Sequence, residues 1–220
     1  MKSINSKTSN MTKIGYILML VVIVTIGSYG KSFAQTNNLS ASDIDKFKKQ
    51  VESMIGAFQN GLSIIGSRTK TQATKESNVK TTMELFMGDG EKYIDSEDGT
   101  EKQVMMQVSS LYRTPKIKNI TLKDYLYSMS RLPFAIVEVT SADNIRLSNF
   151  YKQGDRYVAT ATIFQRFCGY RIVEGRKTKV YCDVTKKTMM VYLYKEVTIF
   201  GEDWAVRLGD TKVDDTSPAN

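Results

Sequence analysis

The stretch from Gly154 to Val213 constrains the fold of this chain more than any other part of the sequence. It is rich in Val, Ile, Thr, Tyr and Phe and reads as three consecutive long strands, at 157–173, 179–200 and 203–213. Such strands exceed the usual length of about five or six residues, and a flat sheet of long strands is unusual. We therefore predict a strongly twisted and bent antiparallel sheet, whose concave face other elements must fill.

The strongest helical pattern lies upstream of these strands. Ser40 and Ser42 are competing N-caps, because each precedes an acidic residue by three positions. Apolar residues then recur in steps of three and four, at Ile44, Phe47, Val51, Met54, Ile55, Phe58 and Leu62. A stripe of this kind is typical of core packing, with partner binding as the alternative.

Shorter elements fill the middle of the chain. A second helix is expected around 79–87, where it is stopped by Gly88, and 68–78 is either a loop or a weak extension of it. A third helix begins at Thr121, whose hydroxyl can cap it, and ends before Pro133. Short strands are expected at 103–112, 134–140 and 144–151.

The N-terminus has the features of a secretory signal. A basic leader precedes the apolar run Ile14–Ile26, and small residues at Ser32 and Ala34 match a cleavage site. As a helix the run would span roughly 20 Å, which is short of the ~30 Å hydrocarbon core of a bilayer. We predict export to the periplasm or the exterior. The alternative is an uncleaved anchor extended to Tyr29, the one route to the membrane that we expect, and no cysteine follows the run as a lipoprotein would require.

The domain organisation follows from these signals. We expect a cleaved signal peptide at 1–34, a short linker at 35–41, a single domain at 42–213 and a disordered tail at 214–220. An exported chain would hold Cys168 and Cys182 in an oxidising compartment. They flank the turn at Gly175, and if Glu174 pairs with Arg176 the two cysteines face each other. We predict a disulfide between them. The alternatives are a one-residue shift of the turn and two reduced thiols.

The composition excludes several kinds of chemistry. The chain has no histidine, which removes Ser-His and Cys-His nucleophilic pairs and every metal site that needs an imidazole. The acidic group at 95–101 lacks the spacing of a calcium loop and is expected to be a solvated loop. No Gly-rich phosphate loop occurs. We therefore expect no metal and no cofactor.

The order of elements resembles that of a known superfamily. Two helices, a strand, a helix and five consecutive strands, closed by the segment Trp204–Asp210, resemble the nuclear-transport-factor-2-like or SnoaL-like superfamily, here as an exported bacterial member. The resemblance covers about 42–213 and implies an α+β, cystatin-like cone, in which N-terminal helices pack into a strongly curved antiparallel sheet. The superfamily includes enzymes, ligand binders and assembly modules, so the fold alone implies no activity.

The resemblance also suggests where a site would lie. Catalytic members hold a His/Asp or Tyr/Asp pair in the cone, and only the second kind is open to a chain without histidine. Asp183 is the one inward acid that we can suggest, and the candidate tyrosines beside it are Tyr125, Tyr170 and Tyr192. The final strand of the family packs an aromatic residue across the cone, which here suggests Trp204. The pocket candidates are therefore Tyr125, Tyr170, Asp183 and Trp204. The alternative for these aromatic residues is an ordinary place in the sheet.

A second candidate surface lies on the central hairpin. Its basic and aromatic residues, which could bind an anionic glycan or lipid head group, are Arg166, Phe167, Arg171, Arg176 and Lys177. Nucleic acid is not expected, because the net charge of +8 includes four lysines within 1–34, which leaves +4 for the rest.

Two classes of function follow. The first is an exported, non-enzymatic binding or assembly module for a protein partner or an anionic envelope ligand, or a homodimer formed through the sheet face. The second is a small-molecule cyclase or isomerase that uses a Tyr/Asp pair in the cone, and an accessory domain of a conjugation or secretion machine is a further alternative. A polar cone with a buried carboxylate would favour the enzyme, whereas a cone plugged by Phe, Met and Trp would favour the module.

Overall fold

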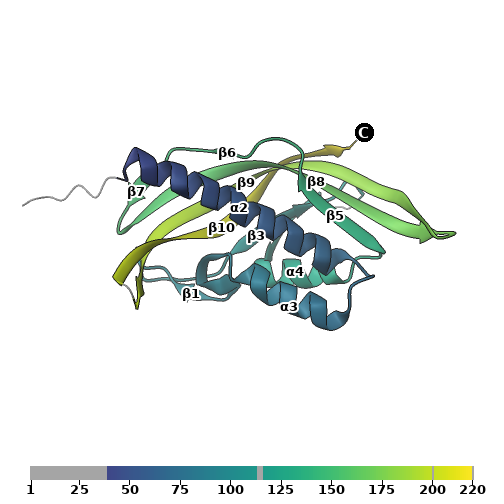
Figure 1. The fold of residues 1–220 in the computed structure, drawn as a ribbon, viewed down its shortest axis with the longest axis horizontal. Helices are drawn as coiled ribbons and strands as arrows, with labels where there is room; N and C mark the ends of the chain where they lie inside the picture. The colour runs from purple at the N-terminus through teal and green to yellow at the C-terminus, as the bar shows by residue number, and fades with distance from the viewer. Residues whose placement is uncertain (1–38, 113–115, 200, 220) are drawn as a thin grey trace, which may run out of the picture. The chain divides into compact units, whose positions relative to one another are not determined.

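The structure, a computed structural model, describes residues 39–112, 116–199 and 201–219, so the predicted signal peptide and most of the linker lie outside the described residues. The fold below is that of the unit Ser40–Asn220. Within the described ranges no helix combines the length and the hydropathy that a membrane crossing requires. Figure 1 shows helices α2, α3 and α4 lying against one large sheet.

Helix α2 (Ala41–Gly66) confirms the strongest helical prediction. Ser40 rather than Ser42 is its N-cap, and Ser40 and Asp43 form a reciprocal capping box. The predicted apolar stripe is the buried face of the helix, with Phe47, Val51, Ile55, Phe58 and Leu62 all 2% exposed or less. The helix therefore packs its stripe into the core.

The other helices show one boundary error and one agreement. Helix α3 (Gln72–Met83) includes most of 68–78, which agrees with the weak extension that the sequence left open there, and it ends before the predicted 87. Thr71 caps it by accepting a hydrogen bond from the backbone N–H of Thr74. Phe86 lies beyond its end, where it forms a parallel bridge with Leu208 and precedes the 3₁₀ helix η1 (Met87–Gly90). Helix α4 (Leu122–Ser130) has the predicted cap, in which Thr121 bonds Asp124.

The large sheet has eight strands among the described residues. Their order is β4-β3-β10-β9-β8-β5, with β6 and β7 also paired to β8. Their bounds are β3 (Met105–Ser109), β4 (Ile117–Thr121), β5 (Ile136–Ser141), β6 (Arg146–Leu147), β7 (Tyr151–Gln153), β8 (Arg156–Val173), β9 (Arg176–Thr198) and β10 (Gly201–Pro218). Strands β1 (Tyr93–Ile94) and β2 (Glu101–Lys102) form a separate pair. The α+β class and the curved, mainly antiparallel sheet are as predicted.

Four details differ from the sequence-based expectation. Strand β4 was not predicted, and the strand expected at 144–151 is split into β6 and β7. Strand β10 pairs with β3 in parallel, which the long connection between them, made of α4 and the strands β4–β9, allows. The prediction of a disordered tail from 214 is wrong as far as Pro218, because β10 continues to Pro218, which pairs with Asp183 of β9.

The concave face of the sheet carries every second residue of the long strands. On β9 these are Asp183, Thr185, Lys187, Met189, Val191 and Leu193, all buried. Register shifts at Leu208/Thr211 and Val213/Asp215 in β10 and at Gly169/Tyr170 in β8 bend the sheet. The helices lie on the concave side, so the buried residues of both layers form one core.

Helix α2 also covers the free edge of β5. The backbone N–H of Val139 donates to Ser63 Oγ and that of Val137 donates to Ser67 Oγ, both at 2.8 Å. Ser141 donates to the Gln59 side chain in the same row. Four residues of a helix rise about 6 Å, which is close to the roughly 6.6 Å that two residues of a strand span. Polar residues at every fourth position of α2 can therefore face every second residue of β5. This edge is therefore closed to pairing with another chain.

The β8–β9 hairpin brings the two cysteines together. Its turn places Glu174 and Gly175 at positive φ, so Val173 rather than Glu174 faces Arg176, a shift of one from the predicted register. The irregularity after Gly169 skips Val180 and restores the expected pairing beyond it. Cys168 then lies opposite Cys182, with Cα atoms 4.1 Å apart, and the two form a disulfide.

Candidate functional site

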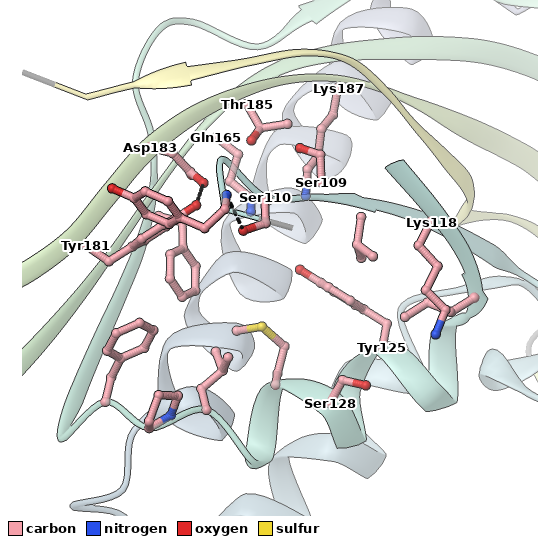
Figure 2. A pocket seen from close by; sticks show the side chains of 18 residues that line it. Ser109, Ser110, Lys118, Tyr125, Ser128, Gln165, Tyr181, Asp183, Thr185 and Lys187 are labelled. Carbon is pink, nitrogen blue, oxygen red and sulfur yellow. Dashed lines mark hydrogen bonds between the residues drawn. The ribbon is translucent and has the colours of Figure 1, made fainter. Parts of the chain in front are cut away.

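A cavity of about 480 Å³ lies between the concave face of the sheet and α4. Strands β8 and β9 form its back wall, β3 and β4 one side, α4 the floor and the loop at 132–134 an end. Figure 2 shows that Gln165, Asp183, Thr185 and Lys187 project from the sheet into it while Tyr125 points up from α4. A cavity of this volume is within the range of small-molecule sites.

Packed aromatic rings line one end of the cavity. Phe167 of β8 and Tyr181 of β9 have ring centroids 5.8 Å apart, and Phe134 lies 6.1 Å and 6.2 Å from them. Gly169 makes room for this cluster, because a Cβ there would come within 2.6 Å of the Phe134 ring. The end therefore offers a rigid apolar wall to a ligand.

A buried carboxyl group lies beside this wall. Asp183 is 4% exposed, and the Tyr181 hydroxyl donates a hydrogen bond to it. Burial raises the pKa of Asp183, against the opposing effects of the Tyr181 hydrogen bond and the positive charge of Lys187. Burial, with the carboxylate next to it, raises the pKa of Tyr181 to about 12. The pair is thus a proton acceptor with a coupled proton donor inside a cavity.

An amine lies further along the same face. Lys187 is 5% exposed, and its ammonium nitrogen is 5.9 Å from the centroid of the Tyr125 ring. Burial lowers the pKa of Lys187 to about 8, and the negative charge of Asp183 offsets only part of this. Within the described chain no carboxylate reaches salt-bridge distance of this ammonium.

Tyr125 completes the polar lining from the helical side. Its side chain is 7% exposed, and its ring packs 6.4 Å from Phe58 of α2. Burial raises the pKa of Tyr125, although the Gln165 side chain next to its hydroxyl acts in the opposite direction. The hydroxyl therefore stays protonated and can donate a hydrogen bond to a ligand.

The structure unites only two of the four predicted pocket residues. Tyr125 and Asp183 line the cavity, whereas Tyr170 and Trp204 do not. Tyr170 lies on the outer face of β8, where its hydroxyl donates to Glu138 at 2.7 Å. Trp204 packs against Tyr157, with centroids 5.4 Å apart, at a distant part of the sheet. Strand parity explains the first error, since even-numbered residues of β8 point away from the concave face.

The predicted basic surface also divides between two faces. Arg166, Arg171, Arg176 and Lys177 are exposed, as expected. Phe167 does not belong with them, because it alternates with Arg166 and lines the cavity instead. Within the hairpin, Lys177 pairs with Glu138 and lies 4.0 Å from the Tyr170 ring centroid, so part of its charge is already neutralised.

The acidic loop is not fully solvated. Asp95 is 3% exposed and pairs with Arg156 of β8 at 3.0 Å and with Lys102 at 2.7 Å. This network fixes the β1–β2 pair against the sheet, so the expectation of a solvated loop is wrong for Asp95. In the described part of the chain no group of three or more Cys, Asp or Glu residues could hold a metal ion.

Sequence reasoning missed Lys187, Tyr181 and Gln165. Lys187 looked like one of many basic residues, next to Lys186. The available signal was parity, because Asp183, Thr185 and Lys187 share a face with the apolar Met189 and Val191. Polar residues that continue an apolar row are the pattern expected of a site within a core.

The comparisons with known proteins add little to this description. No family model matches the chain, and no curated protein matches it. Among solved structures, one from Streptomyces avermitilis, described as a candidate dehydratase of the NTF2-like family, superposes with a TM-score of 0.41 at 14% identity. The match covers 80% of this chain and 98% of that one.

Proposed function

We propose that the protein binds a small, largely apolar organic molecule in the cavity between α4 and the concave face of the sheet. The observation that carries this proposal is a cavity of about 480 Å³ with an apolar aromatic end and buried polar groups, Asp183 and Lys187, on one wall. Concave, mostly apolar sites with a few convergent polar groups are typical of ligand binding.

The sequence-based alternatives turn on whether the cone is plugged, and it is plugged only in part. Phe58 and Phe86, with ring centroids 5.2 Å apart and no more than 1% exposure, fill the concave face beside the cavity. The cavity itself remains lined by polar groups that include a buried carboxyl. This combination supports a binding role and leaves a chemical role open to test.

Fluorescence titration tests the binding proposal. N-phenyl-1-naphthylamine, an uncharged dye that brightens in apolar surroundings, should bind the wild-type protein at one site. The variant Ser128→Trp places a bulky ring at the cavity floor and should abolish the signal. The matched control Ser77→Trp, on an exposed part of α3, should bind as the wild type does. Equal binding by both variants, or none by the wild type, would reject the cavity as the site.

A second candidate function is acid–base catalysis by the Tyr181–Asp183 pair, in an enzyme of the cyclase or isomerase kind. The raised pKa of the buried Asp183 carboxyl favours it, because a carboxylate held in an apolar site is a stronger base than one in water. Proton NMR in deuterated water would test it with cyclohexanone as the probe. Faster exchange of the α-protons with wild type than with Asp183→Asn supports catalysis, and equal rates exclude it for this probe.

We also propose that the protein acts outside the cytoplasm. The basic leader and the short apolar run favour a cleaved signal, and the disulfide is of the kind that persists in oxidising compartments. N-terminal sequencing of the protein from its host should begin at Gln35. An intact Met1 in the membrane fraction would instead indicate the uncleaved anchor.

A further inference from the structure

Lys187 presents a buried positive charge to the cavity, and no carboxylate of the described residues lies at contact distance from it. A desolvated ammonium is unfavourable unless it is paired, and the lowered pKa of Lys187 reflects this. Lys187 lines the cavity, and Figure 2 shows its side chain directed into that space. A ligand in the cavity is therefore in a position to supply the missing negative charge.

The other described groups that line the cavity do not supply this negative charge next to the Lys187 ammonium. Tyr125 on α4 and Gln165 on β8 are neutral, and Lys118 on β4 adds a second positive charge to the lining. Asp183 is the acidic residue of the lining, but it lies four positions along β9 and already accepts a hydrogen bond from Tyr181. The lining thus favours an anion at Lys187 more than a neutral or cationic group.

The cavity also fixes how far the ligand extends. Phe167 is paired with Asp183 and Ile163 is paired with Lys187, so the backbone positions of Phe167 and Lys187 are four residues apart along the strands. Four residues span about 13 Å at roughly 3.3 Å per residue. An occupant that contacts both needs a charged head and an apolar body of comparable length.

We propose that the ligand is an amphipathic monocarboxylate, whose carboxylate pairs with the Lys187 ammonium and whose apolar body reaches Phe134 and Phe167. This inference rests on the proposed function, since it assigns the chemical class of the molecule bound in the same cavity. A carboxylate fits better than a phosphate, because Lys187 is the buried ammonium of the lining, whereas Lys118 is exposed to solvent. One buried ammonium, with no arginine fork in the described lining, neutralises one charge rather than two.

Competition with N-phenyl-1-naphthylamine tests this assignment, using decanoate and 1-decanol as probes of equal chain length. Decanoate should displace the dye from the wild type at a concentration about tenfold lower than decanol, as expected for one charge-assisted contact. Lys187→Met should remove that advantage while leaving the decanol midpoint within about twofold. The control Lys186→Met changes the adjacent lysine, which is exposed and faces Asp214 on the other side of the sheet, and should behave as wild type.

The outcomes separate the two proposals. If the dye does not bind the wild type, the proposed function fails and the assignment fails with it. If the dye binds but decanoate and decanol compete equally, or Lys187→Met weakens both to the same extent, only the carboxylate assignment is overturned. Lys187→Gln repeats the measurement with a neutral polar side chain, so poor folding of one variant does not decide the result.

Discussion

At the scale of single residues, Ser63 links two elements through one hydroxyl. Its Oγ donates to the Gln59 carbonyl and accepts from the Val139 backbone N–H. Ser63→Ala leaves this partly buried N–H without a partner, so we expect unfolding free energy to fall by about 1–3 kcal/mol. Urea denaturation measures it, with the exposed Ser53→Ala on the same helix as control. A loss no larger than that of the control would show that the edge is held by packing alone.

Lys187 makes a prediction about pH. Its pKa is lowered to about 8 in the folded protein from its ordinary value of 10.5, so between these pH values the unfolded chain binds more protons. Stability linked to this group therefore rises with pH across that window and is lowest below pH 8. Lys187→Met should be more stable than wild type at pH 7, by roughly 3 kcal/mol at ~1.4 kcal/mol per pKa unit.

The measurement for Lys187 is the difference between the two proteins, because other titrating groups then cancel. Urea unfolding at pH 7, 8, 9 and 10 should show the advantage of Lys187→Met shrinking as pH rises. The groups that face Lys187 and titrate are Asp183 and Tyr125, whose pKa values are both raised by burial. Both residues are present in both proteins, so their own titration cancels in the difference. A difference that is constant with pH would mean that Lys187 is solvated in the folded state.

A residue of the site could be predicted from the sequence where its residue type alone singled it out, but not where the strand register was needed as well. Asp183 was found because it was the one acid that could face inward. Tyr170 was a candidate and Tyr181 was missed, because the strand register was unknown and one step along a strand reverses the face. Trp204 failed for another reason, since family likeness of a closing strand does not specify which part of a long strand an aromatic residue occupies.

At the scale of elements, the hairpin shows how a correct pairing can arise from an incorrect premise. The turn is shifted by one residue from the prediction, and the unpaired Val180 shifts the register back before Cys182. Sequence patterns do not locate bulges, because the inserted residue has no required identity. Helix caps were easier, since a cap is a local contact over three residues, as at Thr121 and Asp124.

The disulfide should stabilise this hairpin through the unfolded state. The two cysteines are 14 positions apart, and chain-entropy models give about 3 kcal/mol for a loop of this length. The double variant Cys168→Ala/Cys182→Ala should lose about that much stability in urea unfolding. Wild type treated with dithiothreitol should unfold at the same lower concentration, whereas the reductant should leave the double variant unchanged. Two thiols that alkylate freely in the oxidised protein would refute the bond itself.

At the scale of the whole molecule, the concave face serves two purposes. Where α2 crosses it, apolar side chains such as Phe58 fill the space, and where α4 faces it the lining becomes polar and the cavity remains. The curved sheet and the helical stripe were predictable because both follow from periodicity. The division of the face was not, because it depends on where the helices end and on the unpredicted strand β4, which forms part of the cavity wall.

This division predicts that stability and ligand binding respond to different residues. Phe58→Ala removes a ring packed against Phe86 and should lower unfolding free energy by about 3–5 kcal/mol, as core truncations do. The folded fraction should keep its dye affinity within about twofold, because Phe58 does not itself line the cavity and contacts it through Tyr125. Tyr170→Phe, on the outer face, should change neither quantity appreciably.

The single tryptophan makes the two readouts independent. Trp204 lies outside the cavity, so its fluorescence follows unfolding while the dye follows binding. In urea unfolding, the Trp204 fluorescence of Phe58→Ala should change at a lower urea concentration than that of the wild type. At urea concentrations below this transition, the dye should bind Phe58→Ala with the midpoint of the wild type. If the dye signal instead disappears while Trp204 still reports the folded state, the cavity depends on the packed region next to it. The concave face would then be one cooperative unit, and the core of α2 would belong to the binding site.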